Sequence, residues 1–188
     1  MIFGRAARAQ LEELILQAQP LVGIFFRSVA YRYFHPDDVI SGEGTRLYGG
    51  RFVPVGVPAV YGSAEEETAL REVTARQQTL RGKKEIAFRD YPRLTYVLQI
   101  KTERHLDLSG SLPTELRQLL AECFQPGEHS ASQQIAELWI AEGIESVLFP
   151  SALGSGHNIV VYTANAAPGS ITVLNREALI AQMRERLF

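Results

Sequence analysis

Residues 31–72 concentrate side chains that could bind an anionic ligand and act on it. The guanidinium groups in this stretch, forked donors that match phosphate and carboxylate, come from Arg32, Arg46 and Arg51. Glycines at 42, 44, 49 and 50 let the backbone come close to a ligand and aim N–H groups at it. Together they predict a pyrophosphate or carboxylate site, with an ordinary surface loop and solvated arginines as the alternative.

Glu72 is the carboxylate of this stretch that could take part in chemistry. Residues 65–67 are also acidic, but they lie in the first turn of a predicted helix, where the helix dipole favours solvated acids. Glu72 lies beyond that turn, on the flank of the apolar face that contains Ala69. It can therefore pair with Arg71 or Arg76, or stabilise a cation in a cleft.

Tyrosines surround the arginine-rich stretch, and each offers a stacking face and a polar tip to a heteroaromatic ligand. They are Tyr31, Tyr33, Tyr48 and Tyr61. A half-buried core position is the alternative for each of them. Ser151 follows an apolar strand, a place where ligands often bind, although a turn residue would also fit there.

The spacing of apolar residues predicts the elements that must position these groups. Helices are predicted over residues 5–18, 63–80, 113–124, 130–143 and 176–187. Two of them begin with capping boxes, at Ser63/Glu66 and Ser130/Gln133. Predicted strands cover residues 21–26, 30–34, 59–61, 94–100, 105–108, 146–149, 159–162 and 171–174. Residues 35–57 are predicted to be a loop, and a loop of that length is usually functional. Trp139 is expected in the core.

The mixed order of helices and strands favours an α+β fold over a doubly wound parallel sheet. A chain of 188 residues with 46% hydrophobic content favours a single compact domain over residues 1–188. The amphipathic terminal helices are compatible with a homodimer.

Composition excludes several classes of function. A formal net charge of -2 gives no global basic field, so we expect no direct nucleic acid binding. No apolar run approaches the roughly 20 residues of a membrane span, and residues 1–14 lack a signal-peptide core, so we expect no membrane partner and a cytoplasmic location. Cys123, the single cysteine, is predicted to be a small buried residue on a helix. The histidines are too far apart for a metal site.

The sequence resembles the RES domain family, named for its arginine, glutamate and serine. The resemblance rests on YRY at 31–33, SGEG at 41–44, GGRF at 49–52, the strand ending in Tyr61 and TALREV at 68–73, with a weaker echo in VLFPSALGSGHNIVVY at 147–162. It implies a fold similar to that of ADP-ribosyltransferase toxins, with small mixed or antiparallel sheets, flanking helices and NAD in a cleft between sheets.

The resemblance also implies site residues. Arg32, Glu72 and Arg51 would be catalytic, and the NAD-binding set would be Arg32, Tyr33, Arg51, Tyr61, Ser151 and Asn158. NAD would be a substrate, with no separate cofactor and no metal. One departure stands out: the family continues its glycine-glycine-arginine motif with tryptophan and asparagine, whereas Phe52 and Val53 follow Arg51 here.

Family members are typically toxins of toxin–antitoxin pairs that consume NAD. The resemblance therefore implies cleavage of the nicotinamide–ribose bond by hydrolysis or phosphorolysis, and an Xre-type antitoxin partner that blocks the cleft. Transfer of ADP-ribose to a cellular protein is one alternative. A nonenzymatic interaction module, with the loop as a docking surface, is another.

Overall fold

The computed structural model describes residues 5–30, 35–80, 93–110, 112–121, 123 and 129–187. Its helices are α1 (Arg5–Leu16), α2 (Pro36–Ile40), α3 (Glu43–Tyr48), α4 (Glu66–Leu80), α5 (Thr114–Ala121), α6 (Ser130–Ala141) and α7 (Arg176–Leu187). Its strands are β1 (Gln19–Ala30), β2 (Ala59–Ser63), β3 (Arg93–Asp107), β4 (Ser146–Pro150), β5 (His157–Tyr162) and β6 (Ile171–Val173). The predicted α+β class is confirmed.

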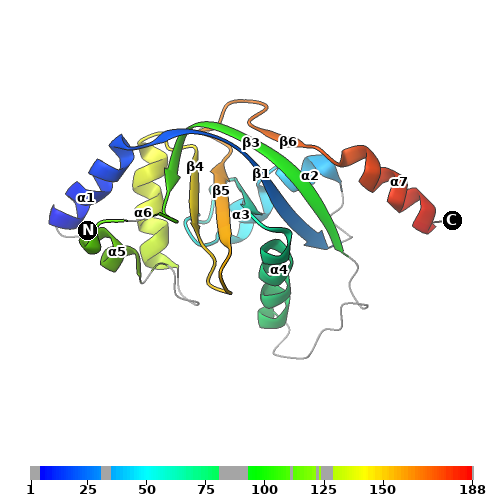
Figure 1. Cartoon of the computed structure of the whole chain (residues 1–188), viewed down its shortest axis with the longest axis horizontal. Coiled ribbons are helices and arrows are strands. Elements are labelled where there is room, and N and C mark those ends of the chain that lie inside the picture. The colour runs from blue at the N-terminus through cyan, green and yellow to red at the C-terminus, as the bar shows by residue number, and fades with distance from the viewer. Residues whose placement is uncertain are drawn as a thin grey trace.

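The strands form one mixed sheet in the order β1-β2-β5-β4-β3-β6. β3 and β4 run parallel, and the other pairings are antiparallel. β1 also pairs with β3, from Gln19 opposite His105 to Ala30 opposite Arg93, so β1, β2, β5, β4 and β3 form a closed ring of pairings. Figure 1 shows β1 and β3 arching over β4 and β5, with α1, α5 and α6 grouped at one end and α4 nearer the other.

Two hydrophobic clusters lie on this framework. The larger one surrounds Trp139 of α6, which is 0% exposed, and includes Phe52 and Phe149, so the predicted core position of Trp139 is confirmed. The second follows β3 and β5, where alternate side chains of β3 such as Tyr96 and Leu98 are buried, as the two-residue period of a strand requires. Because Phe52 lies in the larger cluster, the segment around Arg51 is part of the core.

The prediction of a continuous loop over residues 35–57 is wrong, because α2 and α3 form there. α2 begins at Pro36, whose fixed φ suits a first helical turn, and two acids follow where the helix dipole favours them. Thr45 of α3 donates its hydroxyl to Gly42 O at 2.7 Å and accepts Ala59 N–H at 2.7 Å. This buried hydroxyl ties α3 to the start of β2.

Both predicted capping boxes are wrong. α4 begins at Glu66, and Ser63 is the last residue of β2, with its hydroxyl donating to Asn158 Oδ1 at 2.7 Å. α6 begins at Ser130 itself, and the residue before it, His129, makes no side-chain cap. Spacing alone cannot separate a capping serine from a strand serine with a distant partner. The predicted strands at 94–100 and 105–108 are likewise a single strand, β3.

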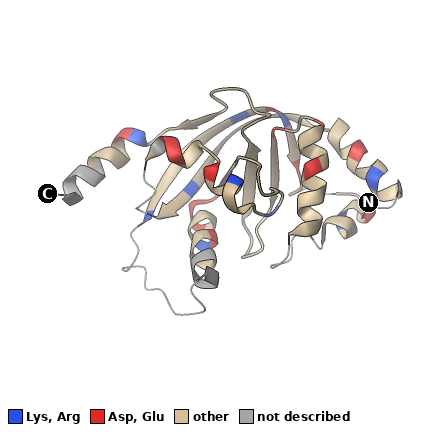
Figure 2. Ribbon diagram, turned by 180° about the vertical axis from the view of Figure 1, so that it is seen from behind, with Lys and Arg blue, Asp and Glu red and all other residues tan. Residues whose placement is uncertain are grey.

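Among the described residues, none of the helices is both long and apolar enough to cross a membrane. Figure 2 shows acidic and basic positions interspersed along the helices and strands, in keeping with the formal net charge of -2. An anion site in this molecule must therefore be built from a few local groups.

Candidate active site

Glu72 of α4 is fixed by side chains from two distant segments. Its Oε1 accepts a hydrogen bond from Ser151 Oγ at 2.7 Å and another from Asn158 Nδ2 at 2.6 Å. Asn158 in turn accepts the hydroxyl of Ser63, so four side chains form one connected network. We call Ser63, Glu72, Ser151 and Asn158 the Glu72 cluster. The structure thus brings together three residues that the sequence assigned to the site, separated by 79 and 86 positions.

The turn between β4 and β5 docks against the start of α4 and thereby brings Ser151 to Glu72. A Cβ on Gly156 would lie 1.9 Å from Thr68 Oγ1, so only glycine allows this close approach. Glu65 Oε2 accepts the N–H of His157 at 3.3 Å and the hydroxyl of Thr68 at 3.0 Å. These contacts hold the turn on the helix one to two turns before Glu72.

Arg51 lies in a tight turn, Gly50–Val53, which we call the Arg51 turn. Gly50 N donates to Val53 O at 2.9 Å and Val53 N donates to Gly50 O at 3.1 Å. Phe52 has a φ of 57°, in the left-handed region that a bulky residue rarely adopts. Its ring is fully buried and packs on Trp139 and Phe149, with ring centroids 5.4 Å and 5.1 Å away. Core packing therefore holds this strained turn.

Polar groups from three elements fasten the same turn through its backbone. Tyr61 donates its hydroxyl to Arg51 O, and Tyr162 donates its hydroxyl to Phe52 O at 2.9 Å. Gln133 of α6 donates Nε2 to Gly50 O at 3.1 Å and to Val53 O at 3.2 Å. A Cβ on Gly50 would lie 2.7 Å from the Tyr61 hydroxyl, so this position requires glycine. These bonds hold the turn through its backbone carbonyls.

The guanidinium of Arg51 is electrostatically coupled to Glu72. Burial lowers the pKa of Arg51, and the negative charge of Glu72 opposes this shift. Burial, followed by the positive charge of Arg51, lowers the pKa of His129. Arg51 thus lies near enough to Glu72 for the two charges to interact, and both residues are half-buried. A carboxylate and a guanidinium so placed suit a ligand that carries an anionic group near a centre that becomes cationic.

Tyr61 is half-buried, and its ring meets Phe149 edge to face, with centroids 6.4 Å apart and an interplanar angle of 85°. Its hydroxyl is used to hold the Arg51 turn. Stacking on nicotinamide, which the resemblance implied for Tyr61, stays a prediction. So do the roles of Arg32 and Tyr33, which lie, with Tyr31, outside the described residues.

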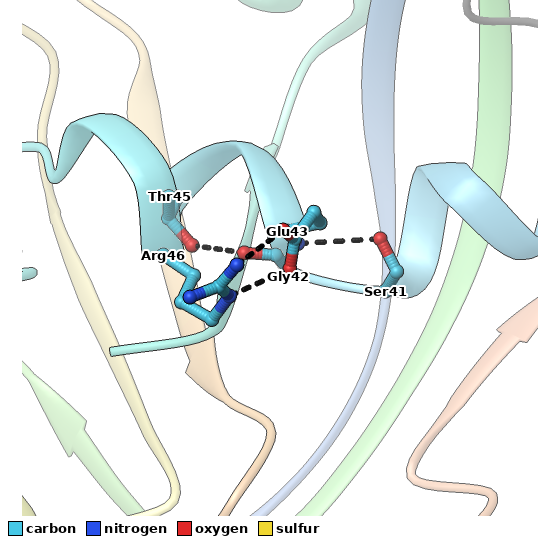
Figure 3. Close-up of polar contacts among 5 residues, drawn as sticks. All are labelled: Ser41, Gly42, Glu43, Thr45 and Arg46. Atoms are coloured by element: carbon cyan, nitrogen blue, oxygen red, sulfur yellow. Dashed lines mark hydrogen bonds and ion pairs between the residues drawn. The ribbon is translucent and has the colours of Figure 1, made fainter. Parts of the chain in front are cut away.

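Arg46, which follows the SGEG segment, forms an ion pair within its own helix. Figure 3 shows Arg46 bound to Glu43 of its own helix, with Nε donating to Oε2 at 2.7 Å and Nη2 to Oε1 at 2.6 Å. Ser41 accepts the N–H of Glu43 at 3.2 Å at the start of this helix. Arg46 is thus paired with an acid of α3, and its proposed role at an anion site stays a prediction. Arg71 pairs with Glu67 at 2.8 Å, so it is not the partner of Glu72.

Sequence reasoning missed four residues around the site: Arg27, Ser63, His129 and Gln133. Arg27 of β1 donates Nη1 to Tyr61 O at 2.6 Å and so joins β1 to β2 beside the site. An arginine within an apolar strand was a usable signal, because such a charge needs a partner. The sequence around Gln133 carried no such signal, since the partners of Gln133 are backbone carbonyls about 80 residues away.

The chain is thus an α+β domain in which a half-buried carboxylate, Glu72, interacts electrostatically with a half-buried guanidinium, Arg51. The model of the RES domain matches residues 18–180, and the chain belongs to this family. A chain in the crystal structure of the M. tuberculosis MbcT–MbcA toxin–antitoxin complex has the same fold, with a TM-score of 0.68 and 19% identity over 95% of this chain and 97% of that one. Among curated proteins, no sequence matches.

Phe52 and Val53, the two residues that differ from the family motif, are both buried in the core. Phe52 keeps the buried aromatic position, as expected, and Val53 is 0% exposed within the larger core cluster. Val53 therefore contributes apolar burial where the family pattern has an amide. Side-chain hydrogen bonds to the carbonyls of the turn come from Gln133, Tyr61 and Tyr162.

Proposed function

We propose that this chain is the toxin of a toxin–antitoxin pair and that it degrades NAD by cleaving the bond between nicotinamide and ribose. Membership of the RES family and the fold shared with a chain of a toxin–antitoxin complex support the toxin assignment. The observation that carries the chemistry is Glu72, fixed at Oε1 by Ser151 and Asn158 and coupled to Arg51.

The proposed reaction fits this geometry. As the bond between nicotinamide and the anomeric carbon breaks, positive charge builds up on the ribose, and nicotinamide leaves neutral with the bonding electron pair. A fixed carboxylate stabilises that developing charge more than it stabilises the substrate, so it lowers the barrier. Both hydrogen bonds to Glu72 enter Oε1, and among the described residues Oε2 has no hydrogen bond. Oε2 is therefore the atom we assign to the ribose.

Arg51 would bind the pyrophosphate or a ribose hydroxyl through its forked donors. Burial lowers its pKa, but a guanidinium is so strongly basic that it keeps its charge at neutral pH. Water that attacks the anomeric carbon would lose a proton and give ADP-ribose. Phosphate in its place would give ADP-ribose 1-phosphate. An antitoxin would inhibit by covering this region, and the cytoplasmic location expected from composition goes with that proposal.

The test is to incubate the purified protein with NAD, with and without phosphate, and to separate the products by chromatography. We expect nicotinamide in both cases, with ADP-ribose or its phosphate ester identifying the acceptor. An absence of nicotinamide release would overturn the proposal. Transfer of labelled ADP-ribose into protein, without free ADP-ribose or its phosphate, would also count against it.

A further inference from the structure

Ser63 is a buried polar residue that the proposed chemistry does not use. It is the last residue of β2, is 4% exposed and lies opposite Asn158 in the pairing of β2 with β5. Its hydroxyl donates to Asn158 Oδ1 at 2.7 Å. A second hydrogen bond then runs from Asn158 Nδ2 to Glu72 Oε1 at 2.6 Å. Ser63 is therefore one residue removed from the carboxylate.

The chemistry of the asparagine amide explains why this serine matters. The two ends of the amide have nearly the same shape, but one accepts and the other donates. Only the orientation with Nδ2 toward Glu72 gives an attraction, since the reverse would set an oxygen against a carboxylate. The Ser63 hydroxyl binds the oxygen end and so favours the productive orientation. Hydrogen bonds in such a chain also polarise one another, so the amide N–H becomes a stronger donor.

Resting on the proposed function, we propose that Ser63 is a positioning residue that fixes the Asn158 amide and, through it, the Glu72 carboxylate. Ser63 touches neither Glu72 nor the proposed ribose position. Ser151 differs, because it binds Glu72 directly from the turn after β4. Of the two bonds to Oε1, the one through Asn158 is backed by a buried partner on the neighbouring strand. One of the two bonds to the carboxylate is thus set from the sheet.

The first test compares nicotinamide release by the S63A and S63T variants with wild type. S63A should lower kcat roughly fivefold to tenfold, the usual effect of one lost hydrogen bond, with little change in KM. S63T keeps the hydroxyl and should restore kcat. The matched control is S146A, which removes another fully buried serine hydroxyl, one that contacts His105 at 2.9 Å away from the site. S146A should lower stability but not kcat.

A double-mutant cycle tests the chain of bonds itself. If Ser63 acts through Asn158, then S63A should have no further effect on kcat in an N158A background. An additive effect would overturn the proposal, as would a kcat in S63A equal to that of wild type.

NMR signals of the Asn158 side-chain amide give a readout that needs no activity. They should shift and exchange faster with water in S63A, but not in S146A. Unchanged signals in S63A would overturn the positioning role. If the wild-type protein releases no nicotinamide, the proposed function fails, while the amide signals still decide whether Ser63 orients Asn158.

Discussion

The two halves of the candidate site are built in different ways. In the Glu72 cluster, side chains hold one another through polar contacts, and Glu72 itself is only half-buried. In the Arg51 turn, carbonyls accept the bonds, and a fully buried phenylalanine anchors the backbone in a strained conformation. The carboxylate of Glu72 is placed by its side-chain partners, whereas the backbone that carries Arg51 is placed by the core. Changes in the Glu72 cluster should therefore affect mainly the rate, and changes in the core packing of the Arg51 turn should affect mainly stability.

The largest expected effect is that of E72Q on nicotinamide release. The glutamine oxygen can still accept bonds from Ser151 and Asn158, so the cluster keeps its shape but loses the charge that we propose stabilises the ribose cation. We expect kcat to fall by about 10²–10³-fold, as when one group that stabilises a transition state is removed. The thermal midpoint should stay close to that of wild type. Rates at saturating NAD and a thermal unfolding curve measure the two quantities.

The control for E72Q is E66Q, which removes an exposed carboxylate from the first turn of the same helix. This variant should keep the rate of wild type. If E72Q retained more than about a tenth of the activity, a rate loss under tenfold, the charge of Glu72 would not be the main stabilising group, and the contrast between the halves would be lost.

The second expected effect is on stability. F52A removes a fully buried ring, which should lower the free energy of unfolding by about 3–5 kcal/mol. Denaturant unfolding measures this change. Activity per folded molecule should fall less than in E72Q, because the charge of Arg51 remains and only its placement loosens.

F52G separates packing from backbone strain. Both variants lose the ring, but glycine adopts a φ near 57° without the steric penalty that alanine incurs. The free energy of unfolding of F52G should therefore equal that of F52A or exceed it by up to about 1 kcal/mol. At most positions glycine would be the less stable of the two. If F52A were clearly the more stable of the two, then the strain assigned to this turn would be wrong.

The two halves also differ in how well the sequence predicted them. Glu72 could be found because its position beyond the first helical turn and beside the apolar face is a local property of α4. Arg51 could be found from the two glycines before it, of which Gly49 has a φ of 62°, a conformation that favours glycine. Ser63 was assigned to a helix cap, because its true partner, Asn158, lies 95 residues away. Gln133 was also assigned to a cap and instead contacts residues 50 and 53.

The fold was likewise predicted where the signal is local and missed where it depends on distant residues. Most helices and strands were predicted within a few residues, because the alternation of apolar side chains is local. The short helices at 36–48 were missed, because five or six residues carry too little periodicity, and α3 depends on a distant bond from Thr45 to β2. The ring of strand pairings could not be predicted either, because register depends on which strands meet in space.

The smallest expected effect concerns acid stability and belongs to the Arg51 half. Burial, reinforced by the charge of Arg51, lowers the pKa of His129 below its ordinary value of 6.5. As the pH falls through about 6.5, the unfolded chain takes up a proton on this residue before the folded chain does, so the free energy of unfolding decreases. Above that pH His129 is neutral in both states, and the full stability is present.

H129Q should therefore lose less stability than wild type when urea unfolding at about pH 7.5 is compared with unfolding at about pH 5. Burial also lowers the pKa of His105, so H129Q should keep the part of the acid sensitivity that comes from His105. The double variant H105Q/H129Q should lose that part as well. Of these two histidines, His129 is the one whose pKa is lowered by the charge of Arg51. Adding R51Q to wild type should therefore reduce the acid sensitivity, and adding it to H129Q should not. An H129Q variant as acid-sensitive as wild type would show that this histidine does not contribute, and would place the acid response outside the Arg51 half.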